Sequence, residues 1–276
     1  TRAPSAVFTL AALLILLSSV GVAAGDEVHF RLSTLSVPDD LKALVTEDLN
    51  EDGLEDLLVV HTKGLEPDET RWLSVFWQSR EGGFSTAPDR SWELDPEATL
   101  VDVGDIAGDR RPEICYLAPT ELRYYAPAES GFEAEPRTLF ELEGMLRFPA
   151  ESEAPLVDFV RDWNADGIDD IAVFTFEGLD LYVGDEARRY GPPDRLRIAL
   201  DTDISQRPTP GMPAEQRVGG VRARYTFPDL HLADFNADGR LDMASWNGEA
   251  LSLWLQKEGG GFEEKALEVP RTGEII

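Results

Sequence analysis

Residues 162–170 read Asp-Trp-Asn-Ala-Asp-Gly-Ile-Asp-Asp, and this nine-residue layout occurs four times in the 276-residue chain. The other copies are DLNEDGLED at 48–56, DIAGDRRPE at 105–113 and DFNADGRLD at 234–242. The copies begin at residues 48, 105, 162 and 234, so successive starts are 57, 57 and 72 residues apart. A period of this length is typical of propellers and solenoids, in which each unit buries an apolar face against its neighbour.

Short apolar strands surround each loop in a constant order. One strand is expected before the loop, at 43–45, 100–103, 156–159 and 230–232, and a second after it, at 57–60, 114–117, 171–174 and 243–246. A third is expected at 73–77, 122–125, 179–183 and 251–255, and a more polar fourth strand, such as 137–142 or 265–269, closes the unit. Gly-Phe pairs stand between the third and fourth strands at 83–84, 131–132 and 261–262. Four strands per repeat predict an all-β fold, a β-propeller of about four four-stranded antiparallel blades.

The units resemble FG-GAP/VCBS repeats, which form the blades of integrin-α-like propellers and of many exported bacterial proteins. The resemblance covers about residues 27–270 and implies blades at about 41–97, 98–153, 154–226 and 227–276, with 27–37 as the outer strand of another blade. Because the last blade has its own outer strand, we expect an open arc, a fragment or half of an assembly. The extra length at 201–227, rich in Pro, Gly and Arg, is expected to be a protruding loop.

Oxygen donors at loop positions 1, 3, 5 and 7 predict calcium, which takes six to eight oxygen ligands. Glycine at position 6 permits the sharp turn that such a loop needs, and a further ligand at position 9 is what the FG-GAP resemblance implies. We expect three structural ions, because a loop that encircles its ion leaves no position for a substrate. The expected ligands, with position 7 using its carbonyl oxygen, are Asp48, Asn50, Asp52, Leu54 and Asp56; Asp162, Asn164, Asp166, Ile168 and Asp170; and Asp234, Asn236, Asp238, Arg240 and Asp242.

Two other kinds of loop share part of this sequence pattern. EF-hands and dockerins are excluded, because position 12 is not acidic and strands replace the flanking helices. A set of Asx-turns without metal is the remaining alternative. The second loop departs from the pattern, since Ala107 removes one ligand and Arg110 replaces the glycine. A weak or empty site is expected there, formed by Asp105, Asp109 and Glu113.

The first 24 residues predict a secretory signal, with Arg2, an apolar run over 6–22 and small residues at 22–24. An uncleaved membrane anchor is the alternative, because the run is nearly long enough to span a bilayer. Residues 25–276 are therefore expected to be secreted, periplasmic or at the cell surface, with no membrane insertion after cleavage. Cys115 is the only cysteine and is expected to be buried, so metal is the candidate staple for this exported domain.

The net charge of −28 argues against nucleic acid and anionic membranes as partners. The chain has no G-x-S-x-G elbow, phosphate-binding glycine loop or H-E-x-x-H motif, and His29, His61 and His231 belong to no recognisable triad. Most of the six tryptophans lie in the repeating strands, so packing between blades is expected rather than a sugar-stacking surface. We therefore expect a non-catalytic binding or adhesion scaffold for an unidentified protein or glycan. The alternative, implied by relatives with such repeats, is an extracellular polysaccharide lyase or hydrolase, or an accessory domain of one.

Overall fold

The structure is a computed structural model, and it describes residues 34–265 except 38–39, 65–67, 82, 130, 147–155, 199, 208–219, 228 and 247–250. For 201–207 and 220–225 it describes the backbone alone. The predicted signal at 1–24 and most of the predicted outer strand at 27–37 lie outside the described residues. The described residues form strands and no helix, so none of their elements is a helix that could cross a membrane.

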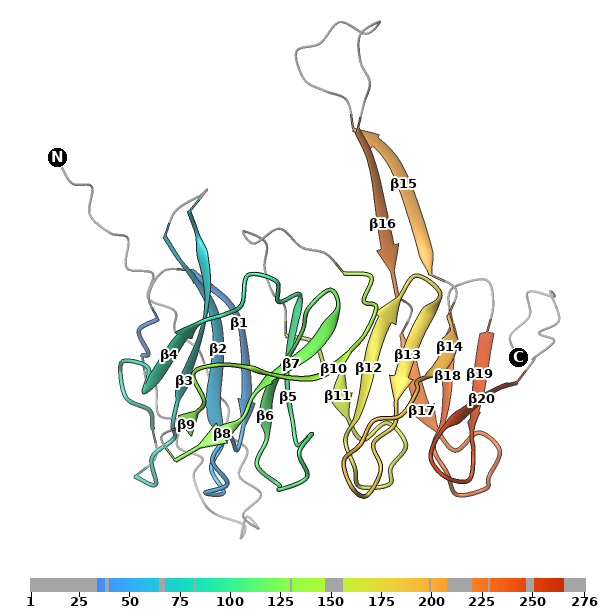
Figure 1. Cartoon of the computed structure of the whole chain (residues 1–276), viewed down its shortest axis with the longest axis horizontal. Helices are drawn as coiled ribbons and strands as arrows, with labels where there is room; N and C mark the ends of the chain where they lie inside the picture. Colours follow the sequence, from blue (N-terminus) through green and yellow to red (C-terminus); the bar gives the residue numbers. More distant parts are fainter. Residues whose placement is uncertain are drawn as a thin grey trace, which may run out of the picture. The chain divides into compact units, whose positions relative to one another are not determined.

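The chain divides into two compact units, 1–158 and 159–276, and unit 1 contains two four-stranded antiparallel sheets (Figure 1). Blade 1 has the order β1 (Leu41–Glu47), β2 (Asp56–Lys63), β3 (Thr70–Phe76) and β4 (Arg90–Glu93). Blade 2 has the order β5 (Leu100–Gly104), β6 (Glu113–Leu117), β7 (Glu121–Tyr125) and β10 (Arg137–Glu141). A short ladder of β8 (Pro127–Ala128) and β9 (Gly131–Phe132) precedes β10.

Unit 2 also contains two four-stranded antiparallel sheets. Blade 3 consists of β11 (Val160–Arg161), β12 (Asp170–Thr175), β13 (Gly178–Tyr182) and β14 (Asp194–Arg197). Blade 4 consists of β17 (Leu230–Ala233), β18 (Asp242–Trp246), β19 (Leu251–Gln256) and β20 (Phe262–Lys265). The prediction of an all-β fold built from four-stranded antiparallel propeller blades is confirmed.

The insertion at 201–227 differs from its prediction as a loop. It forms a two-stranded antiparallel ribbon of β15 (Asp201–Arg207) and β16 (Gly220–Thr226), drawn in Figure 1 as a separate arm. Register pairs Thr202 with Tyr225 and Ile204 with Ala223. Thr202, Ile204 and Tyr225 are β-branched or aromatic residues with charged neighbours, which is the pattern of a strand, whereas most of the prolines and glycines of the insertion belong to residues 208–219.

Three smaller boundaries also differ. The strand expected at 156–159 begins later, at β11, and Leu156 makes only an isolated bridge to Val101. The fourth strand of blade 4 begins earlier than 265, at the Gly-Phe turn itself. Residues 34–37 form no strand, although Ser36 donates its backbone N–H to the carbonyl of Thr86 at 2.8 Å.

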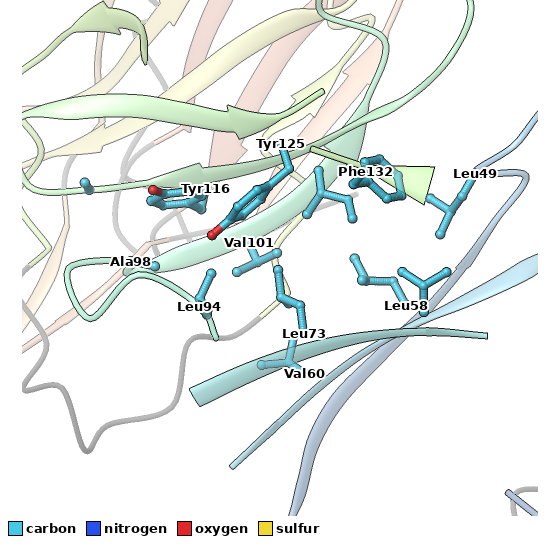
Figure 2. Packing of buried hydrophobic residues seen from close by; sticks show 13 residues of the cluster. Leu49, Leu58, Val60, Leu73, Leu94, Ala98, Val101, Tyr116, Tyr125 and Phe132 are labelled. Atoms are coloured by element: carbon cyan, nitrogen blue, oxygen red, sulfur yellow. The ribbon is translucent and has the colours of Figure 1, made fainter. Parts of the chain in front are cut away.

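The two blades of unit 1 pack through one apolar interface (Figure 2). We call the surface contributed by blade 1 its receiving face; it comes from loop position 2, the second strand and the third strand. The surface contributed by blade 2 is its inserting face, which comes from its first three strands and its Gly-Phe turn. The receiving face comprises Leu49, Leu58, Val60, Leu73, Val75 and Trp77, and the inserting face Val101, Val103, Ile114, Tyr116, Tyr125 and Phe132.

Unit 2 repeats this interface at the corresponding positions. Blade 3 offers a receiving face and blade 4 an inserting face, whose largest side chain, Trp254, is fully buried. The receiving face comprises Trp163, Ala172, Phe174, Leu179, Leu181 and Val183, and the inserting face Leu230, Leu232, Met243, Trp254 and Phe262. Units 1 and 2 therefore each contain one interblade contact that is built from equivalent positions of the repeat.

The Gly-Phe turns contact the preceding blade at both of these interfaces. Phe132 stacks on Trp77 of blade 1 with ring centroids 6.4 Å apart and lies 6.0 Å from Trp92. Gly131, at φ +113°, would bring a Cβ to within 3.4 Å of the Trp77 ring. In unit 2, the N–H of Phe262 donates to the Asp194 carboxylate of blade 3 at 2.9 Å. Glycine before phenylalanine therefore lets the turn of one blade close on the preceding blade.

Candidate metal centres

The three complete loops share one network of hydrogen bonds between side chains and backbone. At position 1, the two carboxylate oxygens accept the N–H groups of positions 5 and 6, as in the bonds from Asp166 and Gly167 to Asp162 at 3.0 and 2.8 Å. The Asn164 side-chain oxygen at position 3 also accepts the N–H of Asp166, at 2.9 Å, and position 5 accepts the N–H of Ile168. The same four bonds, at 2.8–3.1 Å, recur in the loops at 48–56 and 234–242.

Two left-handed residues give each loop its curl. Position 4 has a φ of 59° at Glu51 and Ala165 and of 61° at Ala237, and the position 6 glycines lie at 83–86°. A Cβ built on Gly53 or Gly167 meets nothing within 4 Å. Backbone conformation, rather than lack of space, is therefore the reason for glycine at position 6.

The carboxylate at position 9 has a structural role that the sequence did not reveal. Asp56, Asp170 and Asp242 are each 0% exposed. One oxygen accepts the N–H of position 2, at 3.0–3.2 Å. The other accepts, at 2.8–2.9 Å, the N–H of a residue that ends the third strand, as Gln256 does, or lies two residues beyond it, as Gln78 and Gly184 do. Position 9 thus ties the loop to the third strand of its own blade.

Burial makes two of these carboxyl groups harder to ionise. It raises the pKa of Asp56 to about 6, and the nearby carboxylates of Asp52 and Asp48 act in the same direction, against the lowering effect of the two backbone hydrogen bonds. The pKa of Asp170 rises to about 7 for the same reasons. A cation held by the loop would favour the ionised form of every carboxylate around it.

The degenerate second loop keeps the turn without the missing donors. Asp105 accepts the N–H groups of Gly108 and Arg110, and Asp109 accepts that of Arg111. Arg110 itself adopts a φ of 72°, the conformation of glycine in the other copies. Glu113 is 2% exposed and accepts two backbone N–H groups within its loop, from Ile106 and Ala107. An oxygen donor at position 3 is therefore not needed to form this turn.

The donor chemistry of the three complete loops fits calcium. Positions 1, 3 and 5 supply oxygen atoms, position 5 is exposed in every copy, and an oxygen that accepts one N–H keeps a second lone pair. In the described part of the chain, no group of three or more His, Cys, Asp or Glu side chains is placed to hold a metal ion. This agrees with an amide at position 3 and with a position 9 carboxylate that faces backbone N–H groups.

The two complete loops of unit 2 flank one cavity of about 720 Å³, whose lining includes Asn164, Asp166 and Arg240. Gln256, only 6% exposed, joins the two loops. Its N–H donates to Asp242, its side-chain amide donates to the carbonyl of Asn164 at 2.6 Å, and its carbonyl accepts from Arg240. The two candidate centres are thus linked by hydrogen bonds.

The histidines, the cysteine and the tryptophans of the described residues lie mostly inside the blades. His61 lies inside β2, fully buried, and its Nε2 shares a hydrogen bond with Ser74 at 2.8 Å. His231 is exposed in β17, and Cys115 is buried as predicted. The tryptophans at 77, 92, 163 and 254 pack in the interblade clusters, whereas Trp246 is 48% exposed and the ring of Trp72 carries the Lys63 ammonium 3.2 Å from its centroid.

Residues 48–116 match the family model described as FG-GAP-like repeat. These residues therefore carry an FG-GAP-like repeat. The matched region begins at the first aspartate of the first loop and ends in β6, so it spans one full FG-GAP-like period from the loop of blade 1 to that of blade 2. No curated protein is similar enough to count as a relative.

Among solved structures, this chain is similar to a lectin of Agrocybe aegerita that specifically recognises non-reducing terminal N-acetylglucosamine. The TM-score is 0.37 and the sequence identity 11%, over 81% of this chain and 65% of the lectin chain. The chain thus corresponds to about two thirds of the length of the lectin chain. A similarity at this level carries no information about a ligand.

Proposed function

We propose that this chain is a non-catalytic binding scaffold whose blades are stabilised by calcium in the loops at 48–56, 162–170 and 234–242. The observation that carries the proposal is the contrast between these loops and the one at 105–113. All four make the same kind of turn, yet only three add an amide oxygen at position 3 and glycine at position 6. Oxygen donors beyond the needs of the turn are best explained by a hard cation.

Calcium would be held by side-chain oxygens at positions 1, 3 and 5 and the carbonyl oxygen at position 7, with position 9 as a further candidate. When bound, the ion would supply positive charge against the mutual repulsion of the carboxylates. The buried carboxylate at position 9 already joins the loop to the third strand in this chain. Stabilising the loop therefore stabilises the end of the blade at which the second and third strands are anchored.

Each ion is expected to make a modest contribution. Extracellular calcium modules bind with dissociation constants of about 10⁻⁴–10⁻³ M, so each site adds on the order of 1 kcal/mol at millimolar calcium. Such concentrations occur outside cells, in keeping with the predicted signal at 1–24 and with an exported protein. The scaffold would present its blades and insertions to a protein or glycan partner. A polysaccharide-acting enzyme remains an alternative supported by resemblance alone.

The test compares two matched carboxylates. Asp166 in the third loop and Asp109 in the degenerate loop each accept the N–H two residues later, both at 2.9 Å. Replacing either with alanine removes this bond, and Asp166→Ala also removes the bond from the Asn164 side-chain amide at 3.1 Å, so in EGTA Asp166→Ala should lower the unfolding midpoint somewhat more than Asp109→Ala. In thermal unfolding, added calcium should raise the midpoint of Asp109→Ala by as much as it raises the midpoint of the parent chain. It should raise the midpoint of Asp166→Ala by less.

Isothermal titration provides the count of ions, with magnesium as the control. Three calcium ions per chain are expected, and two in Asp166→Ala. Normal folding in chelator with no calcium-specific heat or shift in midpoint would refute the calcium proposal and leave the Asx-turn alternative. Equal responses of the two variants to calcium would show that the loop at 162–170 holds none of the bound ions.

A further inference from the structure

The loop of blade 4, at 234–242, differs from the other two complete loops at position 7. This position is Leu54 in blade 1 and Ile168 in blade 3, but it is Arg240 in blade 4. The backbone carbonyl proposed as a calcium ligand is present in all three. The arginine side chain adds a guanidinium group, whose positive charge is permanent in proteins. Of the three complete loops, only the one in blade 4 therefore contains a cation within its nine residues.

The Arg240 guanidinium pairs with a candidate calcium ligand of its own loop. Its Nη2 donates to Oδ2 of Asp238, the carboxylate at position 5, and the two groups form an ion pair. Among the described residues, no arginine or lysine forms an ion pair with the position 5 carboxylates of the other two complete loops, Asp52 and Asp166. The carboxylate at position 5 is thus already matched with a positive charge in blade 4 alone.

The extra donor fills the acceptor capacity of one carboxylate oxygen. Oδ2 of Asp238 accepts both the Asn236 side-chain amide, at 2.9 Å, and the Arg240 guanidinium. In blade 3, the equivalent oxygen of Asp166 accepts the side-chain amide of Asn164 at 3.1 Å, and no second donor lies on it in the described residues. Because a carboxylate oxygen has two lone pairs, one remains in blade 3 and none in blade 4. A metal ion that uses this oxygen in blade 4 therefore has to displace a donor.

The guanidinium is also held from its other side. Its Nε donates to the backbone carbonyl of Gln256 at 3.0 Å. Gln256 is itself fixed, because its N–H donates to Asp242 at 2.9 Å and its side-chain amide donates to the carbonyl of Asn164 at 2.6 Å. Ion pairs at a protein surface often contribute little, since two long side chains have to be ordered to form them. Here the bond to a buried residue already orders the arginine beside the loop.

Such an internal cation has opposite effects without and with calcium. Without calcium, its charge offsets the mutual repulsion of the loop carboxylates, which favours the folded loop. With calcium, a divalent ion and a guanidinium compete for one carboxylate. Their repulsion at contact distances in water is expected to weaken calcium binding about tenfold. The arginine therefore stabilises the loop of blade 4 in chelator and lowers its affinity for the ion.

We propose that Arg240 is an internal counter-cation of the loop at 234–242, which makes this loop the weakest of the three calcium sites. The inference rests on the proposed function, because it concerns the affinities of the same loops. The chain then takes up calcium in two stages. The loops at 48–56 and 162–170 fill first, and the loop at 234–242 fills only at higher calcium, when the ion displaces the guanidinium.

Equilibrium dialysis of the full chain against radioactive calcium, from micromolar to tens of millimolar, tests the proposal. The parent chain should show two tighter sites and one that is about tenfold weaker. Arg240→Ile gives the loop the residue that blade 3 has at position 7, and its weakest site should bind about tenfold more tightly than that of the parent. Arg189→Ile is the matched control, because Arg189 lines the same cavity but pairs with Asp185, which is not a candidate ligand. It should leave the three affinities nearly unchanged.

Thermal unfolding supplies a second readout. In EGTA, Arg240→Ile should lower the unfolding midpoint, because the loop carboxylates lose their counter-charge. Saturating calcium should remove this deficit, whereas any deficit of Arg189→Ile should be the same in EGTA and in calcium. Arg240→Gln removes the charge without adding an apolar side chain, and it takes the place of Arg240→Ile in both measurements if that variant does not fold.

The outcomes separate this inference from the proposed function. Three bound ions whose weakest affinity is unchanged in the Arg240 variant would overturn the role of Arg240 and leave the calcium proposal standing. Equal tightening in Arg189→Ile would overturn it as well, since the effect would then come from net charge rather than from the loop. A parent chain that binds no calcium would instead refute the proposed function, and this inference with it.

Discussion

The replacement Asp170→Ala tests whether position 9 holds the loop to its blade without any metal. Asp170 is 0% exposed, and its two oxygens accept the N–H of Trp163 at 3.2 Å and that of Gly184 at 2.9 Å. Alanine leaves both N–H groups without an acceptor. Leaving a buried donor unpaired costs about 1–3 kcal/mol, so the two together cost about 2–6 kcal/mol.

Part of this cost is returned, because the variant no longer buries a carboxylate whose ionisation is itself unfavourable in this position. We therefore expect Asp170→Ala to lower the free energy of unfolding by about 2–4 kcal/mol. Asp170→Asn keeps one carbonyl oxygen but turns an amide group toward the second N–H, so its cost should be about half as large.

The measurement is urea unfolding in EGTA, followed by tryptophan fluorescence, so that calcium makes no contribution. Glu177→Ala is the control, because Glu177 is an exposed turn residue beside the same strands, and it should change stability by less than about 0.5 kcal/mol. If Asp170→Ala is as mild as this control in chelator, the carboxylate does not anchor the loop, and its burial would have to be explained by the ion alone.

Three further predictions concern packing, backbone and metal. Phe132→Ala should cost about 3–5 kcal/mol in urea unfolding, because the ring fills the interface between blades 1 and 2; a cost below 1 kcal/mol would contradict this packing. Gly178→Ala should prevent blade 3 from folding, as judged by circular dichroism, because its Cβ would lie 2.2 Å from a backbone oxygen, whereas Gly191→Ala, with nothing within 4 Å, should be neutral. The double variant Ala107→Asn plus Arg110→Gly should add one calcium ion per chain in calorimetry, and an unchanged count would show that the degenerate loop lacks more than these two residues.

Local pattern was sufficient for the repeat and its loops. The turn closes within nine residues, through hydrogen bonds such as the one from the Gly167 N–H to Asp162. The residues that form it are therefore close together in the sequence and can be recognised as a motif. The second and third strands are equally local, because their apolar runs pair with the adjacent strand across a short turn, as Thr175 pairs with Gly178. The all-β class and the four-stranded blade followed from these elements.

The second role of position 9 could not be predicted from the loop. The partner of Asp56 is 22 residues away at Gln78, and that of Asp170 is 14 residues away at Gly184. Neither spacing carries a motif, because the bond uses a backbone N–H that every residue other than proline possesses. The ribbon at 201–207 and 220–226 was not predicted, because the prolines and glycines of residues 208–219 dominate the composition of the insertion.

Sequence by itself determined the repeat, the loop chemistry and the alternation of apolar side chains, because each depends on neighbours only a few residues apart. Tertiary structure decided which apolar faces are covered. Trp246 and Trp254 belong to adjacent strands of one blade, yet the first is 48% exposed and the second 0%. The physical reason is that burial depends on whether another blade lies against that side of the sheet, and strand alternation alone carries no record of such a neighbour.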